Sequence, residues 1–428
     1  MTSSESAGPG GQSHTGKLSS FALLTERAFL YGWLSGAATS TVRWLDLLAV
    51  GVYVFDRTGS PFQVALVTIV RMLPLALFGA LAGALAEHFD RRRILYVAQV
   101  TMIATSVTLA LLAVSGALEV WHLWVGGFLL GCFWVADFSC RRTMMAEAAG
   151  PERVGIAMSL ESVTNNGTRM LGPTLGGLLL EWVGIEGAYW LSAVGYVLAL
   201  VCTLRFPRFV RVEGAASVGL IASIVEGVRY LRGDRTVMGV LVVTLVFNLW
   251  AFPCVSMVPV IGKDELGLSA FPVGLLMSAE GAGAFCGALL LVGLAPLRWF
   301  RRLYVGGVAL YLAMALGFSQ SPVAVVAGGC LLVAGLGGAA FAAMQSTLVL
   351  MNSAPAVRAR MMGLLSVFIG SGPIGFLHIG LMANLFGAPT AVLVCTLEGL
   401  SALLIVWRIW PELLQLQGIS ELTGKVAS

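Results

Sequence analysis

Long apolar segments separated by short polar connections run through most of the chain. A transmembrane α-helix needs about 20 predominantly apolar residues, and on this measure we predict twelve spans. They cover residues 28–55, 62–85, 94–114, 121–138, 154–183 and 187–206, then 237–261, 271–295, 303–318, 323–350, 361–386 and 388–410. The pattern therefore predicts an all-α integral membrane protein.

The polar stretches around these spans divide the chain. Residues 1–20 are rich in Ser and Gly and lack an apolar core, so we expect a disordered cytoplasmic tail and not a cleaved secretion signal. Residues 207–236 form a polar linker, and we expect its amphipathic part, 220–231, to lie along the cytoplasmic face of the membrane. The predicted division is then an N-terminal six-helix bundle at 21–206, a C-terminal one at 237–410 and a second cytoplasmic tail at 411–428.

Composition narrows the class of protein. Hydrophobic residues make up 58% of the chain and the mean hydropathy is +0.89, which excludes a soluble enzyme with a large core. The 52 Gly fit closely packed transmembrane helices. The seven Cys are scattered without a CxxC pair, so we interpret them as buried packing residues. We expect no cofactor and no metal.

The distribution of basic residues predicts the orientation in the membrane. With both termini inside, 21 of the 26 Lys and Arg fall on the cytoplasmic side, two fall outside, and three lie within spans. Basic residues concentrate in cytoplasmic loops of membrane proteins, so this arrangement is strongly favoured over the inverted one. The net charge of +4 is thus a topology signal, and we expect no nucleic-acid partner.

The second half of the chain repeats features of the first. Gly172-Pro173 in the fifth span has a counterpart at Gly372-Pro373 in the eleventh, and each follows a basic loop. Arg298, Arg301 and Arg302 stand where a degenerate copy of the charged loop after the second span would fall.

That loop reads GALAEHFDRRR from Gly83 to Arg93 and is the densest charge cluster in the chain. It resembles the loop between the second and third helices of the major facilitator superfamily of transporters, Gly-x-Leu-Ala-Asp-Arg-x-Gly-Arg-Lys. Gly83, Leu85, Ala86, Arg91 and Arg92 fit this pattern, Glu87 replaces the Asp, and Asp90 replaces the second Gly. With this Asp the loop reads FDRRR, and in this respect it resembles a bacterial exporter branch that includes siderophore and macrolide efflux proteins. The resemblance covers essentially the whole chain and implies two pseudo-symmetric six-helix bundles with substrate bound between them.

Glu87 and Arg91 are four residues apart, so they can pair on one face if the second helix extends that far. The resemblance implies that Asp137, at the end of the fourth helix, completes this pair. The three residues would then form a latch that stabilises the outward-facing state. The alternative is that these charges only set topology and solubility.

The fifth span contains Gly172, Pro173, Gly176 and Gly177. Pro removes a backbone donor and kinks a helix, and Gly permits close packing. The segment resembles the Gly-Pro motif in helix five of proton-coupled exporters, which favours export, although Thr168 occupies one expected Gly position. A kink needed only for packing would fit either direction of transport.

Ionisable groups within spans cost about 2.5–3.5 kcal/mol on insertion scales and are functional candidates by default. Arg43 and Asp46 are three residues apart in the first span, and Arg71 enters at a similar depth. Asp46 is either held between the two arginines as a permanent ion pair or exchanges protons when its partner is displaced.

Further candidates follow the same argument. Glu161, Asn165 and Arg169 are spaced by four and predict a polar stripe lining a cavity, with Glu161 exposed to water near the cytoplasmic side. Glu280 in the eighth span is a second possible proton carrier, and Glu398 in the twelfth is expected to contact a neighbouring helix. Aromatic and neutral polar candidates for the cavity are Trp44, Phe133, Trp134, Asn248, Trp250, Phe341, Gln345 and His378, and His378 could relay protons or only pack.

These patterns predict a secondary transporter of the bacterial inner membrane. No GxxxxGK[ST] nucleotide loop is present, so an ion gradient or the substrate's own gradient would supply the energy, and we favour proton antiport. The predicted cargo is an amphipathic small molecule such as a drug, siderophore or other secondary metabolite, exported by a monomer in the lipid bilayer. A lipid or lysolipid flippase and an importer of the same fold remain alternatives. A membrane-integral enzyme or sensor would need a soluble domain or a clustered His/Cys/Asp ligand set, and the sequence indicates neither.

Overall fold

The computed structural model describes residues 22–88, 90–150, 153–206, 234–294, 296–353 and 357–415. Every regular element within these ranges is a helix. The N-terminal half contains α1 (Ala22–Thr25), α2 (Arg27–Thr58), α3 (Pro61–His88), α4 (Arg91–Val114), α5 (Val120–Ala149), α6 (Val154–Trp182) and α7 (Ile185–Arg205). The C-terminal half contains α9 (Arg235–Val246), η1 (Phe247–Ala251), η2 (Phe252–Met257), α10 (Val258–Asp264), α11 (Ala270–Leu294), η3 (Leu297–Trp299), α12 (Phe300–Ser319), α13 (Ala324–Asn352), α14 (Arg358–Ile369), α15 (Gly372–Phe386), α16 (Ala388–Ile409) and η5 (Pro411–Leu414).

Eleven helical segments in the described residues are long and apolar enough to cross a membrane. The twelfth predicted span is α6, a continuous helix of 29 residues. Its apolar sequence is interrupted by the polar residues Glu161, Asn165 and Arg169. The predicted fold class, an all-α membrane protein with two six-helix halves, is confirmed.

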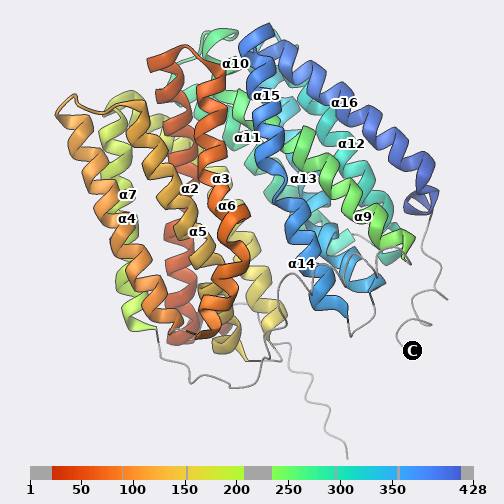
Figure 1. The fold of residues 1–428 in the computed structure, drawn as a ribbon, viewed down its shortest axis with the longest axis horizontal. Helices are drawn as coiled ribbons and strands as arrows, with labels where there is room; N and C mark the ends of the chain where they lie inside the picture. The colour runs from red at the N-terminus through yellow and green to blue at the C-terminus, as the bar shows by residue number, and fades with distance from the viewer. Residues whose placement is uncertain are drawn as a thin grey trace, which may run out of the picture.

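The two halves stand side by side and meet through a few helices (Figure 1). α6 packs against α11 and α3 packs against α15, while α10 reaches across to α2. In the view of Figure 1 the ribbons of the halves approach at the upper end, where the chain passes from α2 to α3 and from α10 to α11, and diverge toward the lower end, where it passes from α3 to α4.

Polar contacts fasten the halves together at the upper end. Lys263 of α10 lies 3.1 Å from Asp56 of α2. The backbone N–H of Phe271 donates to Glu181 over 2.8 Å, and Ser60 donates to Asn384 over 3.4 Å. The structure therefore represents a state closed at the upper end.

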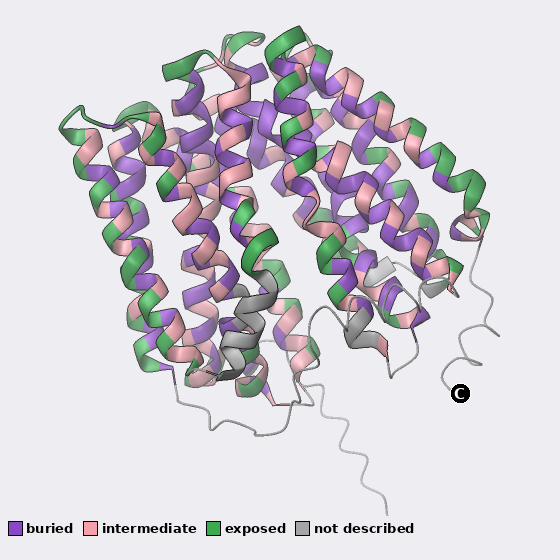
Figure 2. Ribbon diagram, in the orientation of Figure 1, coloured by how far each residue is buried: buried purple, intermediate pink, exposed green. Residues whose placement is uncertain are grey.

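Burial follows the packing of helices against each other (Figure 2). Residues where helices face one another are buried, whereas the outer faces of α4 and α16 carry exposed residues. Many of the exposed side chains are large and apolar, for example Val97, Trp182, Val325 and Ile405. An apolar surface of this extent on a folded chain is the surface that lipid covers.

Two predicted spans are broken. In the seventh, α9 gives way to the π-helical η1 and the 3₁₀-helical η2 before α10, where Pro253 and Pro259 lack the N–H that an unbroken α-helix needs. In the eleventh, α14 ends at Ile369 and α15 begins at Gly372, with Pro373 in the first turn of α15. Sequence hydropathy does not register these breaks, because the residues on both sides are equally apolar.

Some predicted spans end too early. α5 continues to Ala149, so Arg141 and Arg142 lie in a helix and not in a loop. The first residues after the last span pack on the C-terminal half: Leu413 is 1% exposed and the Leu414 carbonyl accepts a hydrogen bond from Arg302. The predicted N-terminal tail 1–20 and the amphipathic segment 220–231 lie outside the described residues.

Candidate functional site

A cavity of about 310 Å³ lies between the two halves. Its wall is built from α2, α3, α5 and α6 of the N-terminal half and from η2, α10, α11 and α15 of the C-terminal half. Small-molecule sites have volumes of roughly 300–1,000 Å³ and mostly apolar walls. We refer to this space as the central cavity.

The charged residues of its wall are all basic. Arg43, Arg71, Arg142 and Arg169 line it, and no Asp or Glu occurs among the described residues that do so. The remaining wall is largely apolar and aromatic, with Trp44, Trp134, Phe252 and Phe376 among its residues. Of the predicted cavity residues, the structure thus brings together Arg43, Trp44, Arg71, Trp134, Asn165 and Arg169.

Arg43 does not pair with Asp46, so the prediction that Asp46 is held between both arginines is wrong. Its guanidinium donates to the Asn165 Oδ1 atom and, over 3.3 Å, to the Ser40 hydroxyl. The same group lies 5.4 Å from the ring centroids of both Trp44 and Trp134. Asp46, three residues further along α2, lines a different cavity from Arg43, so the spacing of three did not produce a contact.

Asp46 instead forms an ion pair with Arg71 of α3 over 3.0 Å. Arg71 is 8% exposed and also donates to the Arg43 backbone carbonyl over 2.8 Å. The Asp46 carboxylate faces a second, smaller cavity inside the N-terminal half, next to Tyr189 and Tyr196. The pair therefore fixes α2 to α3 within one half.

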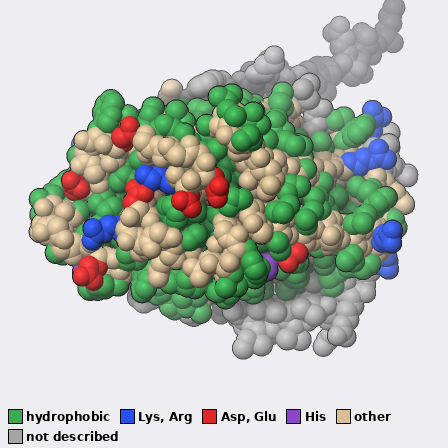
Figure 3. Space-filling model, turned by 90° about the horizontal axis from the view of Figure 1, so that it is seen from above, with side chains coloured by type: hydrophobic (Ala, Val, Ile, Leu, Met, Phe, Trp, Pro, Cys, Tyr) green, Lys and Arg blue, Asp and Glu red, His purple; other side chains and the backbone are tan. Residues whose placement is uncertain are grey.

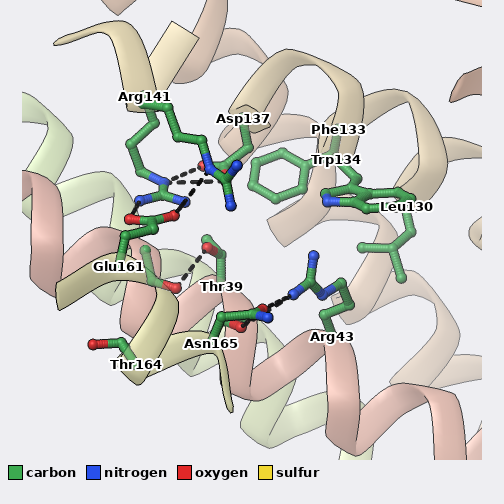
Figure 4. A pocket seen from close by; sticks show the side chains of 13 residues that line it. Thr39, Arg43, Leu130, Phe133, Trp134, Asp137, Arg141, Glu161, Thr164 and Asn165 are labelled. Atoms are coloured by element: carbon green, nitrogen blue, oxygen red, sulfur yellow. Dashed lines mark hydrogen bonds and ion pairs between the residues drawn. The ribbon is translucent and has the colours of Figure 1, made fainter. Parts of the chain in front are cut away.

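A second buried cluster joins α5 to α6 (Figure 4). Arg141 contacts both oxygens of Glu161 over 2.7 Å and the Asp137 carboxylate over 2.9 Å. Glu161 is 8% exposed, which corrects the expectation of a water-exposed side chain. Arg142 approaches Glu161 at 3.4 Å. Sequence reasoning missed Arg141 because the fourth span was ended too early, although its spacing of four from Asp137 predicts such a contact.

The ion pair between Arg169 and Glu280 connects the two halves. Arg169 of α6 lies 2.5 Å from Glu280 of α11, whose side chain is 2% exposed. One turn further up, the Thr174 N–H and hydroxyl contact the Ser278 hydroxyl over 3.0 and 2.6 Å. Two predicted candidates that lie 111 residues apart in the sequence thus face each other at the interface of the halves.

The glycines of the helix-five motif allow this interface to form. An added Cβ at Gly172 or Gly176 would meet α2, at 2.6 Å from Trp44 Cβ and from the Leu45 carbonyl respectively. A Cβ at Gly177 would lie 2.5 Å from the Ala270 carbonyl of α11. Pro173 lies inside the continuous helix α6, and its carbonyl would contact a Cβ at Gly274. The motif therefore packs α6 between α2 and α11.

The charged loop at the lower end has a different arrangement from the one predicted. α3 ends at His88 and α4 begins at Arg91, so Glu87 and Arg91 do not share a helix face. The packing of Gly83 and the side chain of Glu87 lie outside the described part of the structure. Arg91 pairs with Glu147, and Asp137 is bound to Arg141. Asp90 caps α4 by accepting the Arg92 N–H over 3.0 Å, and the Arg92 side chain donates to the carbonyls of Thr203 and Leu204.

Some candidates lie away from the central cavity. Gln345 is buried inside the C-terminal half and donates to Thr244 over 3.2 Å. Glu398 contacts His378 over 2.8 Å and Trp250 over 2.9 Å, as expected of a residue that contacts neighbouring helices. Cys395 completes a group whose ligand atoms lie within 4.8 Å of one another. Spacing along the chain does not indicate this His/Cys/Glu group, because its members become neighbours only when α15 packs against α16.

Comparison with known proteins identifies the family. A family model described as transmembrane secretion effector, a branch of the major facilitator superfamily, matches residues 18–418. The chain belongs to this family. It is therefore a multi-pass membrane transporter and not an enzyme.

Relatives within the superfamily include efflux proteins. The chain is 26% identical over 400 residues to the multidrug efflux pump Tap of Mycobacterium tuberculosis, covering 89% of this chain and 92% of Tap. It is 22% identical over 266 residues to macrolide efflux protein A of Streptococcus pyogenes, covering 60% and 64% of the two chains. The match to the uncharacterized MFS-type transporter YfiS of Bacillus subtilis, at 26% identity over 194 residues, spans 44% of this chain and only 45% of YfiS.

The fold is shared with solved transporters. The nucleoside transporter NupG superposes with a TM-score of 0.69 over 90% of this chain and 99% of its own, at 14% sequence identity. At this identity the likeness establishes the fold and nothing about the substrate.

Proposed function

We propose that this transporter exports an amphipathic small molecule by alternating access and proton antiport, as a monomer with both termini in the cytoplasm. The observation that carries the proposal is the ion pair between Arg169 and Glu280, because it joins the two halves that must move relative to each other.

The distribution of charge supports the orientation. Figure 3 looks onto the upper end. The charged residues around the helix ends there are mainly acidic, namely Asp56, Glu119, Glu181, Glu186, Asp264 and Glu265, and the basic ones are Arg57 and Lys263. The basic residues Arg91, Arg92 and Arg93 form the first turn of α4 at the lower end, and Arg153 directly precedes α6 at the same end. By the positive-inside rule the lower end faces the cytoplasm. The state closed at the upper end is then inward-facing.

Protonation of Glu280 and the ion pair with Arg169 exclude each other. When the upper end opens, α6 and α11 separate and the pair is lost, so the carboxylate is left without its cation in an apolar setting and takes up a proton. When the upper end closes, Arg169 returns, the ion pair forms again and the proton leaves toward the cytoplasm. A proton thus travels inward in the same cycle that carries substrate outward.

Export is the direction favoured by two further observations. The helix-five segment with Gly172 and Pro173 resembles the Gly-Pro motif of proton-coupled exporters, and the relatives Tap and macrolide efflux protein A are named as efflux proteins. The apolar and aromatic wall of the central cavity suits an amphipathic cargo.

Transport into inverted membrane vesicles tests this proposal. A panel of fluorescent amphiphiles with positive, neutral and negative charge is offered while the vesicle lumen is made acidic. We expect at least one dye to accumulate only with the gradient, and Glu280→Gln to abolish this accumulation while retaining dye exchange at equal pH. Glu398→Gln, which changes a membrane Glu that does not join the halves, serves as the matched control and should accumulate dye normally.

Other results would replace parts of the proposal. Dye accumulation that does not depend on the proton gradient would contradict proton antiport. Gradient-driven loss of preloaded dye would indicate an importer. A panel without any transported member, followed by accelerated flipping of labelled lysolipid, would indicate a flippase.

A further inference from the structure

We propose that the central cavity binds the anionic group of its amphipathic cargo, with Arg43 as the principal cation. This inference names the chemical class of the substrate and rests on the transport function proposed above. A carboxylate, phosphate or sulfonate on an apolar body would fit.

The first argument is the charge of the cavity wall. Around the central cavity and the adjoining cluster, Arg71 pairs with Asp46, Arg169 pairs with Glu280, and Arg141 and Arg142 share Asp137 and Glu161. These pairs balance in charge. Arg43 has no carboxylate within ion-pair distance among the described residues, so one positive charge is left over at the cavity wall.

An uncompensated cation in a membrane protein is unfavourable by several kcal/mol unless an anion or water offsets it. The neighbours of Arg43 are the neutral Asn165 and Ser40 and the two indole rings of Trp44 and Trp134. Ring faces and amide oxygens hold a guanidinium in place without neutralising it. The side chain is therefore positioned and still carries its full charge.

The second argument is independent of the first and concerns hydrogen bonds. Three N–H groups of cavity-lining residues are buried without an acceptor among the described residues: Arg43 Nε, Trp44 Nε1 and Arg169 Nε. Buried polar groups in folded proteins are almost always paired, and each exception calls for a missing partner. All three groups are donors, so the missing partner is an acceptor.

These donors lie close together. The guanidinium of Arg43 is 5.4 Å and that of Arg169 is 5.0 Å from the Trp44 ring centroid, so both cations lie near the same indole. Both arginines line the central cavity, so an anionic group there that reaches both would accept charge-assisted hydrogen bonds from two planar guanidinium forks. The apolar part of the same molecule would lie against Phe252, Val255 and Phe376 of the opposite half.

Such a ligand would also act on the interface of the halves. An anion on Arg169 competes with Glu280 for the same guanidinium. Binding of cargo from the lower end would therefore weaken a contact that holds the upper end closed, which is the step needed to carry the cargo across.

The test is binding to the purified full-length protein in nanodiscs of neutral phosphatidylcholine, with two fluorescent probes. The probes 8-anilinonaphthalene-1-sulfonate and N-phenyl-1-naphthylamine differ only in the sulfonate. We expect the anionic probe to bind the wild type at least tenfold more tightly after correction for empty nanodiscs, since hydrogen bonds to charged groups contribute this much. Arg43→Gln should lose about tenfold in affinity for the anionic probe and less than twofold for the neutral one.

Arg57→Gln is the matched control, because Arg57 lies on the same helix, is exposed and does not line the cavity. It should bind both probes as the wild type does. A measurement on the wild type alone covers the case in which Arg43→Gln does not fold: raising the salt concentration should weaken binding of the anionic probe and leave the neutral one unchanged. Equal affinities of the two probes, or equal losses for both in Arg43→Gln, would overturn the inference.

A further arm separates the two sources of an amphipathic anion. Adding phosphatidylglycerol to the nanodiscs should displace the anionic probe if a lipid headgroup enters the cavity, and leave it bound if the cargo is water-soluble. The vesicle assay stays separate from these binding measurements. Charge-selective binding without transport would contradict the proposed export function and support the anion site. Transport of cationic dyes that is unchanged in Arg43→Gln would support export and contradict the anion site.

Discussion

Arg169 of α6 and Glu280 of α11 form a buried ion pair over 2.5 Å that spans the interface between the two halves. The pair exists only while α6 and α11 are in contact, so it stabilises the state closed at the upper end relative to a state open there.

Glu280→Gln should shift the protein toward opening at the upper end. Loss of one charge of a buried pair is worth several kcal/mol, and each 1.4 kcal/mol changes a population ratio about tenfold. Ala270 is 7% exposed in the closed state. We expect Ala270→Cys to react with a membrane-impermeant maleimide several-fold faster in the Glu280→Gln background. Equal rates there and in the Glu398→Gln background would show that the pair does not hold the halves.

Arg141→Ala should be the most destabilising substitution in the N-terminal half. It would leave Asp137 and Glu161 buried without their main cation, at a cost of about 3–5 kcal/mol. Thermal unfolding of the detergent-solubilised protein would show a much lower midpoint than for Arg142→Ala, whose side chain is 38% exposed and approaches Glu161 at 3.4 Å. Similar midpoints for the two variants would contradict the assigned role of Arg141.

Gly177→Ala should impair transport by pushing α6 away from α11, because its Cβ would lie 2.5 Å from the Ala270 carbonyl. The control is Gly167→Ala in the same helix, where a Cβ has nothing within 4 Å and where Ala improves helix propensity by about 1 kcal/mol. We expect normal insertion for both variants and a large loss of initial uptake rate only for Gly177→Ala. Unchanged uptake in Gly177→Ala would mean that this contact can relax without consequence.

Arg91→Ala and Glu87→Gln test the predicted latch at the lower end. If these residues stabilise the outward-facing state together with Asp137, both variants should insert into the membrane and transport more slowly. Arg93→Ala removes an 80% exposed charge of the same loop and should transport normally. Wild-type transport rates in both variants would contradict the latch and would mean that these charges only set topology and solubility.

His378→Gln should retain gradient-driven transport. The contact between His378 and Glu398 lies within the C-terminal half, and neither residue lines the central cavity. Uptake would be compared with that of Glu280→Gln in the same vesicles. A loss as large as that in Glu280→Gln would place the proton path at α15 and α16 instead of the interface.

The sequence by itself determined the positions of the spans and the class of the protein. A membrane-spanning helix satisfies its backbone hydrogen bonds within its own segment, so local hydropathy suffices to locate it. The sequence was also sufficient to identify the loop from Gly83 to Arg93 and the segment around Pro173, because each is a continuous motif. The candidates Arg43, Arg71, Asn165 and Arg169 were identified for a similar reason, since a polar group within an apolar span stands out.

Only the tertiary structure decided which charges meet. Asp46 pairs with Arg71 and not with Arg43, Asp137 pairs with Arg141, and Arg169 reaches Glu280 in the other half. A side chain's partner depends on the rotation of its helix and on the helix packed beside it, and spacing along the chain fixes neither. Arg43 therefore became the unpaired cation of the central cavity only once α2, α3 and α6 had packed together.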